Sequence, residues 1–427
     1  MFSKFKKTPN ILAGHSLQDF VNYNLYYFFA TFLLVGIQKL VIFPFIANKL
    51  GAEQFGSFVL FMTIINIIIV AIPGCINLVI IRVHSQYEKY QKFGLIKSGL
   101  LLNFILSIFT GILFFFIFPF FAKLFKIDPI YKIFLFPLAV YLVVYNIREG
   151  FLILKRIDLK FKEIAIYNII FAILFILIIP LYSVFREKGI SLGYVLIVTI
   201  ATLIILPKTI NILKGKISSN FLKQFYKFSP SFALASILEL LLIASSRYII
   251  SYYKDPTQVA YFFAATSVVQ VLAFPFAQIR TILLPFISQK KSLKEFKLKE
   301  IKAILFTSLG IGILMFVVGM IIGKFIITSL YGLDYYAHSR VVLFIILFGY
   351  IFNVFKIYLK NFIIVFFKRS VLIFNVTIML LINIFINILF VPKYGINASA
   401  AGLSISLIIS AIMWYVVFVR KLSEIRE

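Results

Sequence analysis

The sequence predicts an all-α polytopic membrane protein with twelve transmembrane helices. Three observations lead to this fold class: the 427 residues are 62% hydrophobic, only 14% are charged, and the mean hydropathy is +1.04. Soluble domains are about half apolar and about a quarter charged. The composition therefore excludes a soluble protein and predicts a chain that lies mostly within the bilayer.

Six apolar runs in the first half of the chain are long enough to span a membrane, which takes roughly 20 residues. Charged or turn-forming residues bound them, such as Lys49 and Gly51 after the first run. That run is too long for a signal-peptide core and lacks a cleavage pattern, so we expect it to be retained. The predicted spans are 24–47, 56–81, 98–122, 133–154, 164–185 and 190–212.

Six further runs follow in the second half, at 228–252, 258–287, 302–326, 340–362, 371–392 and 399–419. Short matches link the two halves. Gln54-Phe55-Gly56 before the second span resembles Gln258-Val259-Ala260 before the eighth, and Gly189-Ile190 and Gly395-Ile396 recur at nearly the same spacing. We therefore expect two parallel six-helix repeats, residues 1–213 and 214–427, with the substrate path between them.

The formal net charge of +28 is distributed unevenly along the chain. The termini and the loops after the even-numbered spans hold most of the 43 lysine and arginine residues. By the positive-inside rule, both termini are cytoplasmic. The basic excess thus indicates topology and contact with anionic membrane lipids rather than with nucleic acid.

Enzymatic chemistry has little support in the sequence. The single Cys75 and three scattered histidines exclude a disulfide framework and a clustered metal site, and we expect no cofactor. Gly-rich phosphate loops and paired catalytic carboxylates are missing from the sequence. The predicted outward loops are too short to hold a catalytic domain, so a transporter or channel is favoured over an enzyme.

Seven ionisable residues lie at least five residues inside the ends of the predicted spans, five of them positive. A charge at a helix centre costs about 2.5–3.5 kcal/mol, so a cationic surplus needs water or an anionic partner. A water-filled cavity that binds a diphosphate supplies both, and arginine binds phosphate oxygens in pairs. The candidate substrate-binding residues are Arg280, Arg247, Lys39, Arg148 and Lys356. The alternative is that the side chains reach the headgroups, as we expect for Lys356 with Lys360 one turn further on; Glu149 partly neutralises Arg148.

Glu239 is the only carboxylate deep in a predicted span, eight residues or about 12 Å before Arg247. It is a candidate for binding a coupling ion, either H⁺ or Na⁺, or for satisfying polar groups of a neighbouring helix. Seven asparagines in the spans are expected to form interhelical hydrogen bonds: Asn66, Asn103, Asn168, Asn353, Asn375, Asn383 and Asn387.

Several motifs resemble those of a known family. Phe43-Pro44-Phe45 followed by Leu50-Gly51 and Phe55-Gly56 resembles the first-span signature of bacterial polysaccharide flippases. Further matches lie at Phe228-Ser229-Pro230, at Leu284-Pro285-Phe286-Ile287-Ser288 and at Val391-Pro392-Lys393-Tyr394-Gly395-Ile396 with Ala400-Ala401-Gly402. In order and spacing they resemble Wzx-type O-antigen flippases of the multidrug/oligosaccharidyl-lipid/polysaccharide exporter superfamily. One departure is Ser246, where the family usually has an acidic residue beside Arg247.

The resemblance implies a MATE-like, V-shaped pair of lobes around a cationic cavity. It also implies transport of an undecaprenyl-diphosphate-linked oligosaccharide to the outer leaflet of a bacterial inner membrane, alongside other polysaccharide assembly proteins. Three alternatives remain open. A MATE-like organic-cation antiporter would need several intramembrane carboxylates, a lipid II flippase usually has fourteen spans, and a membrane-embedded polymerase or acyltransferase would need a hydrophilic catalytic loop.

Overall fold

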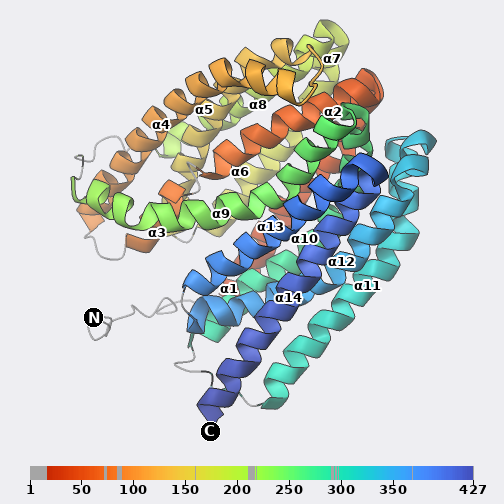
Figure 1. The fold of residues 1–427 in the computed structure, drawn as a ribbon. Helices are drawn as coiled ribbons and strands as arrows, with labels where there is room; N and C mark the ends of the chain where they lie inside the picture. Colours follow the sequence, from red (N-terminus) through yellow and green to blue (C-terminus); the bar gives the residue numbers. More distant parts are fainter. Residues whose placement is uncertain are drawn as a thin grey trace.

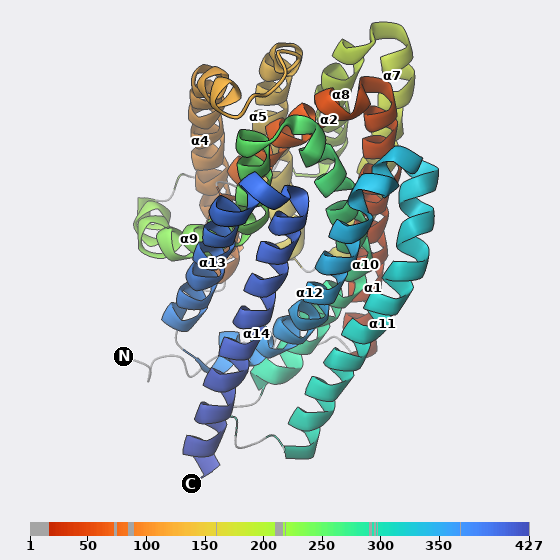
Figure 2. The same cartoon turned by 45° about the vertical axis from the view of Figure 1, so that its right-hand side comes forward.

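A computed structural model describes residues 17–71, 75–83, 89–158, 160–209, 217, 219–289, 293, 296, 298–367 and 369–426. Within these residues the chain is almost entirely helical and contains no β-strand. The long helices run alongside one another in a bundle (Figures 1 and 2), with the C-terminal helices in cyan to blue beside the N-terminal ones. The predicted all-helical membrane architecture is confirmed.

The N-terminal half contains helices α1 to α8. Their bounds are α1 Leu17–Gly36, the π-helix η1 Ile37–Ile42, α2 Phe43–Ile69, α3 Cys75–Val83, α4 Lys89–Leu124, α5 Tyr131–Ile157, α6 Phe161–Leu174, the 3₁₀ turn η4 Phe175–Leu177, α7 Ile178–Phe185, α8 Glu187–Ile205 and the 3₁₀ turn η5 Leu206–Lys208.

The C-terminal half contains α9 to α14. Their bounds are α9 Ser219–Tyr253, α10 Pro256–Gln289, α11 Leu298–Leu330, α12 Leu333–Phe366, α13 Arg369–Tyr394 and α14 Ile396–Arg426.

Two sequence features shape the segment from α1 to α2. Pro44 lies in the first turn of α2 and has no amide hydrogen to bond to the carbonyl of Leu40, and the π-helix η1 immediately precedes it. Gly51 has φ +76° and ψ 168°, which interrupts α2 within its helical run. Glycine reaches this backbone conformation without the steric cost of a side chain. The Pro44 and Gly51 positions thus bend the chain where the sequence predicted the first span to end.

Ten described helices are long and apolar enough to cross a membrane. The first, Leu25–Ile69, covers the first predicted span and part of the second, on either side of the Gly51 break. Helix α9 covers the seventh predicted span and has ample length, but it is not among the ten. It carries charged and hydroxyl side chains, including Glu239, Ser246 and Arg247. The predicted number of twelve spans is therefore approximate.

Corresponding helices pack in the same pairs in the two halves. In the N-terminal half, α1 packs on α6, α2 on α5, and α5 on both α4 and α8. In the C-terminal half, α9 packs on α13, α10 on α12, and α12 on both α11 and α14. A duplicated six-helix unit would produce this pattern. The predicted boundary at residue 213 lies outside the described residues, and the division at that point stays a prediction.

Apolar packing joins the two halves at one end of the bundle. The largest buried cluster includes Phe55 and Phe58 of α2 together with Phe262 and Phe263 of α10. Two smaller clusters lie toward the other end, each built mainly from one half. One contains Ile80, Leu95 and Phe151, joined by Phe221 from the start of α9, and the other contains Ile287, Phe362 and Trp414. By the predicted topology, the shared cluster lies toward the outward side.

Candidate functional site

Lys39 lies on the π-helix η1, where the two halves meet. Its Nζ donates a hydrogen bond to Oε1 of Gln270 on α10. The hydroxyl of Tyr331, in the turn between α11 and α12, donates to the backbone carbonyl of Lys39 over 3.3 Å. The extra residue per turn of a π-helix leaves local backbone groups without their usual α-helical partners, and such helices are frequent at functional sites. Lys39, which belongs to the N-terminal half, is thus held by two polar side chains of the C-terminal half.

Arg247 on α9 is buried, with 9% of its surface exposed. Its Nη1 donates to Oγ1 of Thr63 on α2 over 2.8 Å, and the guanidinium carbon lies 5.1 Å from the ring centre of Phe263 on α10. The Nε of Arg247 is buried and has no hydrogen-bond partner among the described residues. The arginine is therefore held by an alcohol and an aromatic face, neither of which neutralises its charge.

Lys39 and Arg247 form what we call the central cation pair. Both cations contact α10: Lys39 through Gln270 and Arg247 through Phe263, which lie seven residues or about 10 Å apart along that helix. Within the part of the chain that the structure describes, neither forms a salt bridge with a carboxylate. Two like charges in a buried setting repel each other, and a bound anion would relieve that repulsion.

Arg148 on α5 has a different environment. It is 1% exposed, its Nη1 lies 2.7 Å from Oε1 of Glu149, and its Nη2 donates to Oδ1 of Asn168 over 3.0 Å. Its guanidinium also stacks 4.0 Å from the ring centre of Phe171. Glu149 pairs in addition with Arg156 at 2.9 Å. Arg148 thus joins α5 to α6 as part of an ion-paired cluster of two arginines and one glutamate. Its contact with substrate stays a prediction.

Glu239 is paired in the structure. Its Oε1 accepts from Nζ of Lys360 on α12, and the exposed fractions of the two side chains are 45% for the glutamate and 11% for the lysine. The sequence interpretation treated Glu239 as a lone acid and counted Lys360 among residues at the membrane edge. The correction has a simple cause: the long lysine side chain extends from α12 to the carboxylate on α9.

Two other predicted cations have less defined surroundings. Nζ of Lys356 lies 3.5 Å from the sulfur of Met379 on α13, in a partly buried position. Arg280 lies in α10, but its side chain is outside the described residues. Their predicted roles in substrate binding stay predictions.

The interhelical role expected for the asparagines is confirmed for several of them. Asn383 donates to the carbonyl of Leu242 over 2.8 Å and to Oγ of Ser246 over 3.0 Å, which ties α13 to α9. Asn103 donates to the carbonyl of Asn146 over 2.8 Å, which ties α4 to α5. Ser246, at the position where an acidic residue was expected, thus serves helix packing rather than the neighbouring arginine.

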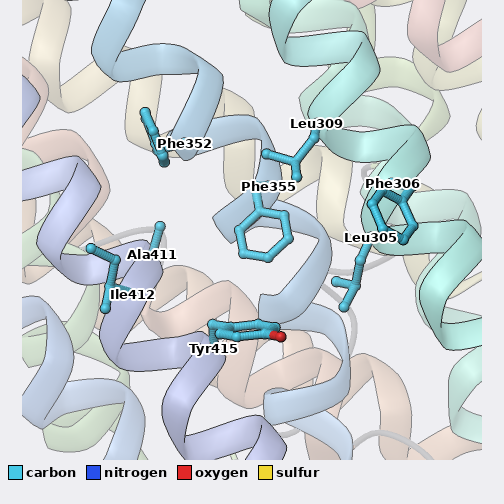
Figure 3. Close-up of a pocket in the computed structure, with 8 residues that line it drawn as sticks. All are labelled: Leu305, Phe306, Leu309, Phe352, Phe355, Ala411, Ile412 and Tyr415. Atoms are coloured by element: carbon cyan, nitrogen blue, oxygen red, sulfur yellow. The ribbon is translucent and has the colours of Figure 1, made fainter.

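The two described pockets are apolar. One has a volume of about 380 Å³ and is lined by α11, α12 and α14 (Figure 3); its residues are Leu305, Phe306, Leu309, Phe352, Phe355, Ala411, Ile412 and Tyr415. The other has a volume of about 340 Å³ and lies between α4 and α5. Neither has a charged side chain in its lining, so they suit hydrocarbon chains and not an anionic headgroup.

Comparison with known families identifies the chain. The profile of a family described as polysaccharide biosynthesis protein matches residues 45–340. The chain belongs to this family. The matched region includes Glu239, Arg247 and Arg280, whereas Lys39 precedes it and Lys356 and Lys360 follow it.

Solved structures show which fold this polysaccharide biosynthesis protein has. The lipid II flippase MurJ in an inward closed conformation matches with a TM-score of 0.74 at 18% identity, over 93% of this chain and 87% of that one. A variant of the MATE transporter VcmN from Vibrio cholerae matches with a TM-score of 0.71 at 12% identity, over 95% of this chain and 98% of that one. A MOP superfamily transporter from Pyrococcus furiosus with a binding pocket of reverse polarity matches with a TM-score of 0.70 at 13% identity, over 95% of this chain and 96% of that one.

These similarities establish a MurJ- and MATE-like transporter fold for this member of the polysaccharide biosynthesis protein family. No curated protein matches its sequence. The multi-pass membrane character predicted from composition agrees with the ten apolar helices.

Several residues at the site were missed by sequence reasoning. Thr63, Phe263 and Gln270 contact the central cation pair, and Lys360 pairs with Glu239. Thr63 and Gln270 are isolated polar residues within long apolar runs, which is a signal that could have marked them. Phe263 gives no such signal, because phenylalanine is abundant throughout the chain.

Proposed function

We propose that the protein is a non-enzymatic flippase for a lipid-linked oligosaccharide, carrying an undecaprenyl-diphosphate-linked repeat unit of the O-antigen or capsule type. It moves this substrate from the cytoplasmic to the outer leaflet of a bacterial inner membrane, with both termini in the cytoplasm. The observation that carries the proposal is the central cation pair: Lys39 and Arg247 both contact α10 where the halves pack together, and neither has a carboxylate bound to it within the described residues.

The chemistry of the pair suits a diphosphate. Arg247 offers a planar guanidinium that binds two phosphate oxygens at once, and Lys39 adds a mobile ammonium. Membership of a polysaccharide biosynthesis family supports a glycan on the lipid carrier. Organic-cation export is disfavoured because the pair would repel a cation.

The remaining sequence predictions enter as part of the proposal. Arg280 and Lys356 extend the cationic surface, and Arg148 supports it from within the N-terminal half. Residues 1–213 and 214–427 act as two lobes that rock about the central cation pair. Other polysaccharide assembly proteins supply the substrate and use it after transport.

The energy for transport comes from the membrane potential and a coupling ion, H⁺ or Na⁺, for which Glu239 is the candidate site. An anion that moves outward across an inside-negative membrane releases about 2.3 kcal/mol per unit charge per 100 mV.

Export of surface polysaccharide by a host that lacks its own flippase tests the proposal. We expect Arg247→Ala to reduce export by at least about tenfold, because truncating a buried charged contact costs about 2–5 kcal/mol, and Arg247→Lys to retain part of it. Lys393→Ala, which removes an exposed cation near the end of α13, is the matched control and should export normally. Normal export by Arg247→Ala at the wild-type membrane level would refute the proposal.

A further inference from the structure

The Glu239–Lys360 ion pair joins two helices that do not pack along their length in the described part of the chain. Helix α9 packs mainly on α13 and α3, and α12 packs mainly on α11, α14 and α10. The two side chains therefore meet across a space between their helices. An ionised carboxylate exposed to lipid at this depth would be costly. The 45% exposed surface of Glu239 is thus best accounted for by water in a lumen.

The pair lies on the predicted cytoplasmic side of the central cation pair. Lys360 is six residues, or about 9 Å, from the cytoplasmic end of α12. Glu239 lies about 12 Å before Arg247 along α9. A diphosphate that comes from the cytoplasm would therefore reach Lys360 before it reaches Arg247.

The two cationic positions differ in one respect that matters for anion binding. Lys360 already has a carboxylate bound to it, whereas Lys39 and Arg247 have none among the described residues. An anion that binds Lys360 must displace Glu239, so its binding free energy from this contact is only the difference between the new ion pair and the one that is lost. An anion that binds the central cation pair displaces no carboxylate and also relieves the repulsion between two cations.

We propose that Lys360 is the first binding position for the substrate's diphosphate and that Glu239 is its resident counter-anion, which the diphosphate displaces. This inference rests on the proposed function. Because Glu239 competes with the diphosphate at Lys360, the diphosphate binds more weakly there than at the central cation pair. This difference in affinity favours outward movement of the headgroup. Displacement also frees the Glu239 carboxylate for a coupling cation only while substrate occupies Lys360.

Binding of farnesyl diphosphate, a short polyprenyl diphosphate, to the purified full-length protein tests the inference. Titration calorimetry in detergent would give the Kd for each variant, with farnesol and inorganic pyrophosphate as comparison ligands. Glu239→Gln removes the competing charge, so we expect it to tighten binding of farnesyl diphosphate about tenfold. Lys360→Gln should weaken binding about tenfold.

The double variant separates competition from a general change in charge. In the Lys360→Gln background, Glu239→Gln should have little further effect, because the lysine for which the carboxylate and the diphosphate compete has been removed. The matched control is Glu163→Gln, which breaks the ion pair between Glu163 and Lys155 at the edge of the N-terminal half; it should leave the Kd unchanged. Melting temperatures of all variants check that each is folded.

The possible outcomes distinguish this inference from the proposed function. Suppose that the wild type binds farnesyl diphosphate but Glu239→Gln does not lower the Kd, or lowers it equally in the Lys360→Gln background. The counter-anion role of Glu239 is then wrong, and the flippase proposal stands. If pyrophosphate binds as tightly as farnesyl diphosphate, or the wild type binds neither, the lipid-diphosphate substrate and this inference both fail.

Discussion

At the scale of single residues, the buried arginines of this protein differ in what surrounds them. Arg148 contacts a carboxylate, an amide oxygen and an aromatic ring, whereas Arg247 contacts a hydroxyl and an aromatic ring. A buried arginine that is paired with a carboxylate can hold two helices together. Removing the arginine then takes a cationic partner away from the buried carboxylate. The same residue type therefore links helices on α5, and on α9 it has the surroundings that the proposed anion-binding role requires.

This difference predicts responses to truncation that differ in size. Arg148→Met should lower the free energy of unfolding by about 3 kcal/mol, because Glu149 keeps only Arg156 of its two arginine partners and the hydrogen bond that links α5 to Asn168 on α6 is broken. Arg247→Ala should change it by less than about 1 kcal/mol, because removing a repelled cation offsets the lost contacts. Thermal unfolding of the detergent-solubilised protein measures both. Equal melting temperatures for Arg148→Met and wild type would contradict the packing role.

Sequence reasoning found the central cations but not their neighbours. Charged residues within apolar runs stand out by composition alone, which is why Lys39 and Arg247 were recognised. Contacts between distant segments depend on how each helix is rotated, and helices that are apolar on every side give no periodic signal of that rotation. The pairing of Lys360 with Glu239, 121 residues apart in the chain, could therefore not be predicted.

At the scale of elements, the contact between α2 and the start of α10 is unusually close. A Cβ atom added to Gly56 would lie 1.8 Å from the backbone oxygen of Pro256. Because backbone atoms cannot move aside as a flexible side chain can, only glycine permits this approach. Nearby, Asn48 donates to the carbonyl of Leu330 over 2.8 Å, and Tyr248 donates to the carbonyl of Leu60 over 2.7 Å. These contacts hold the halves together at the predicted outward end.

Gly56→Val should force α2 away from α10. We expect the yield of crosslinking between cysteines at positions 48 and 330 to fall at least about fivefold, because the valine moves the two positions further apart. Gly310→Val is the matched control, since nothing lies within 4 Å of a Cβ at Gly310, and it should crosslink like the parent. A short bifunctional thiol reagent and gel electrophoresis give the yield; the native Cys75 is buried. Equal yields from the two valine variants would show that the glycine contact is not needed for closure.

At the scale of the whole molecule, the two halves share their largest apolar cluster toward the predicted outward end. Two smaller clusters, one built mainly from each half, lie toward the other end, where α9 also packs on α3. The sequence predicted the helices, and the same helix pairs occur in both halves. It could not predict at which end the halves share most of their packing, because the same apolar residues can pack in more than one state and the balance between states depends on a few kcal/mol.

Holding the outward end closed should therefore stop transport without unfolding the protein. Cysteines at positions 48 and 330, joined by a short bifunctional thiol reagent that forms disulfide links, would fasten α2 to α11 where Asn48 meets the carbonyl of Leu330. In vesicles loaded with a fluorescent polyprenyl-diphosphate glycan, we expect flipping to fall at least about tenfold after crosslinking and to recover when dithiothreitol cleaves the link. Each single-cysteine variant, treated in the same way, controls for labelling alone. Transport that continues at the uncrosslinked rate in the linked protein would mean that the substrate does not pass between α2 and α11, and that opening of this end is not part of the cycle.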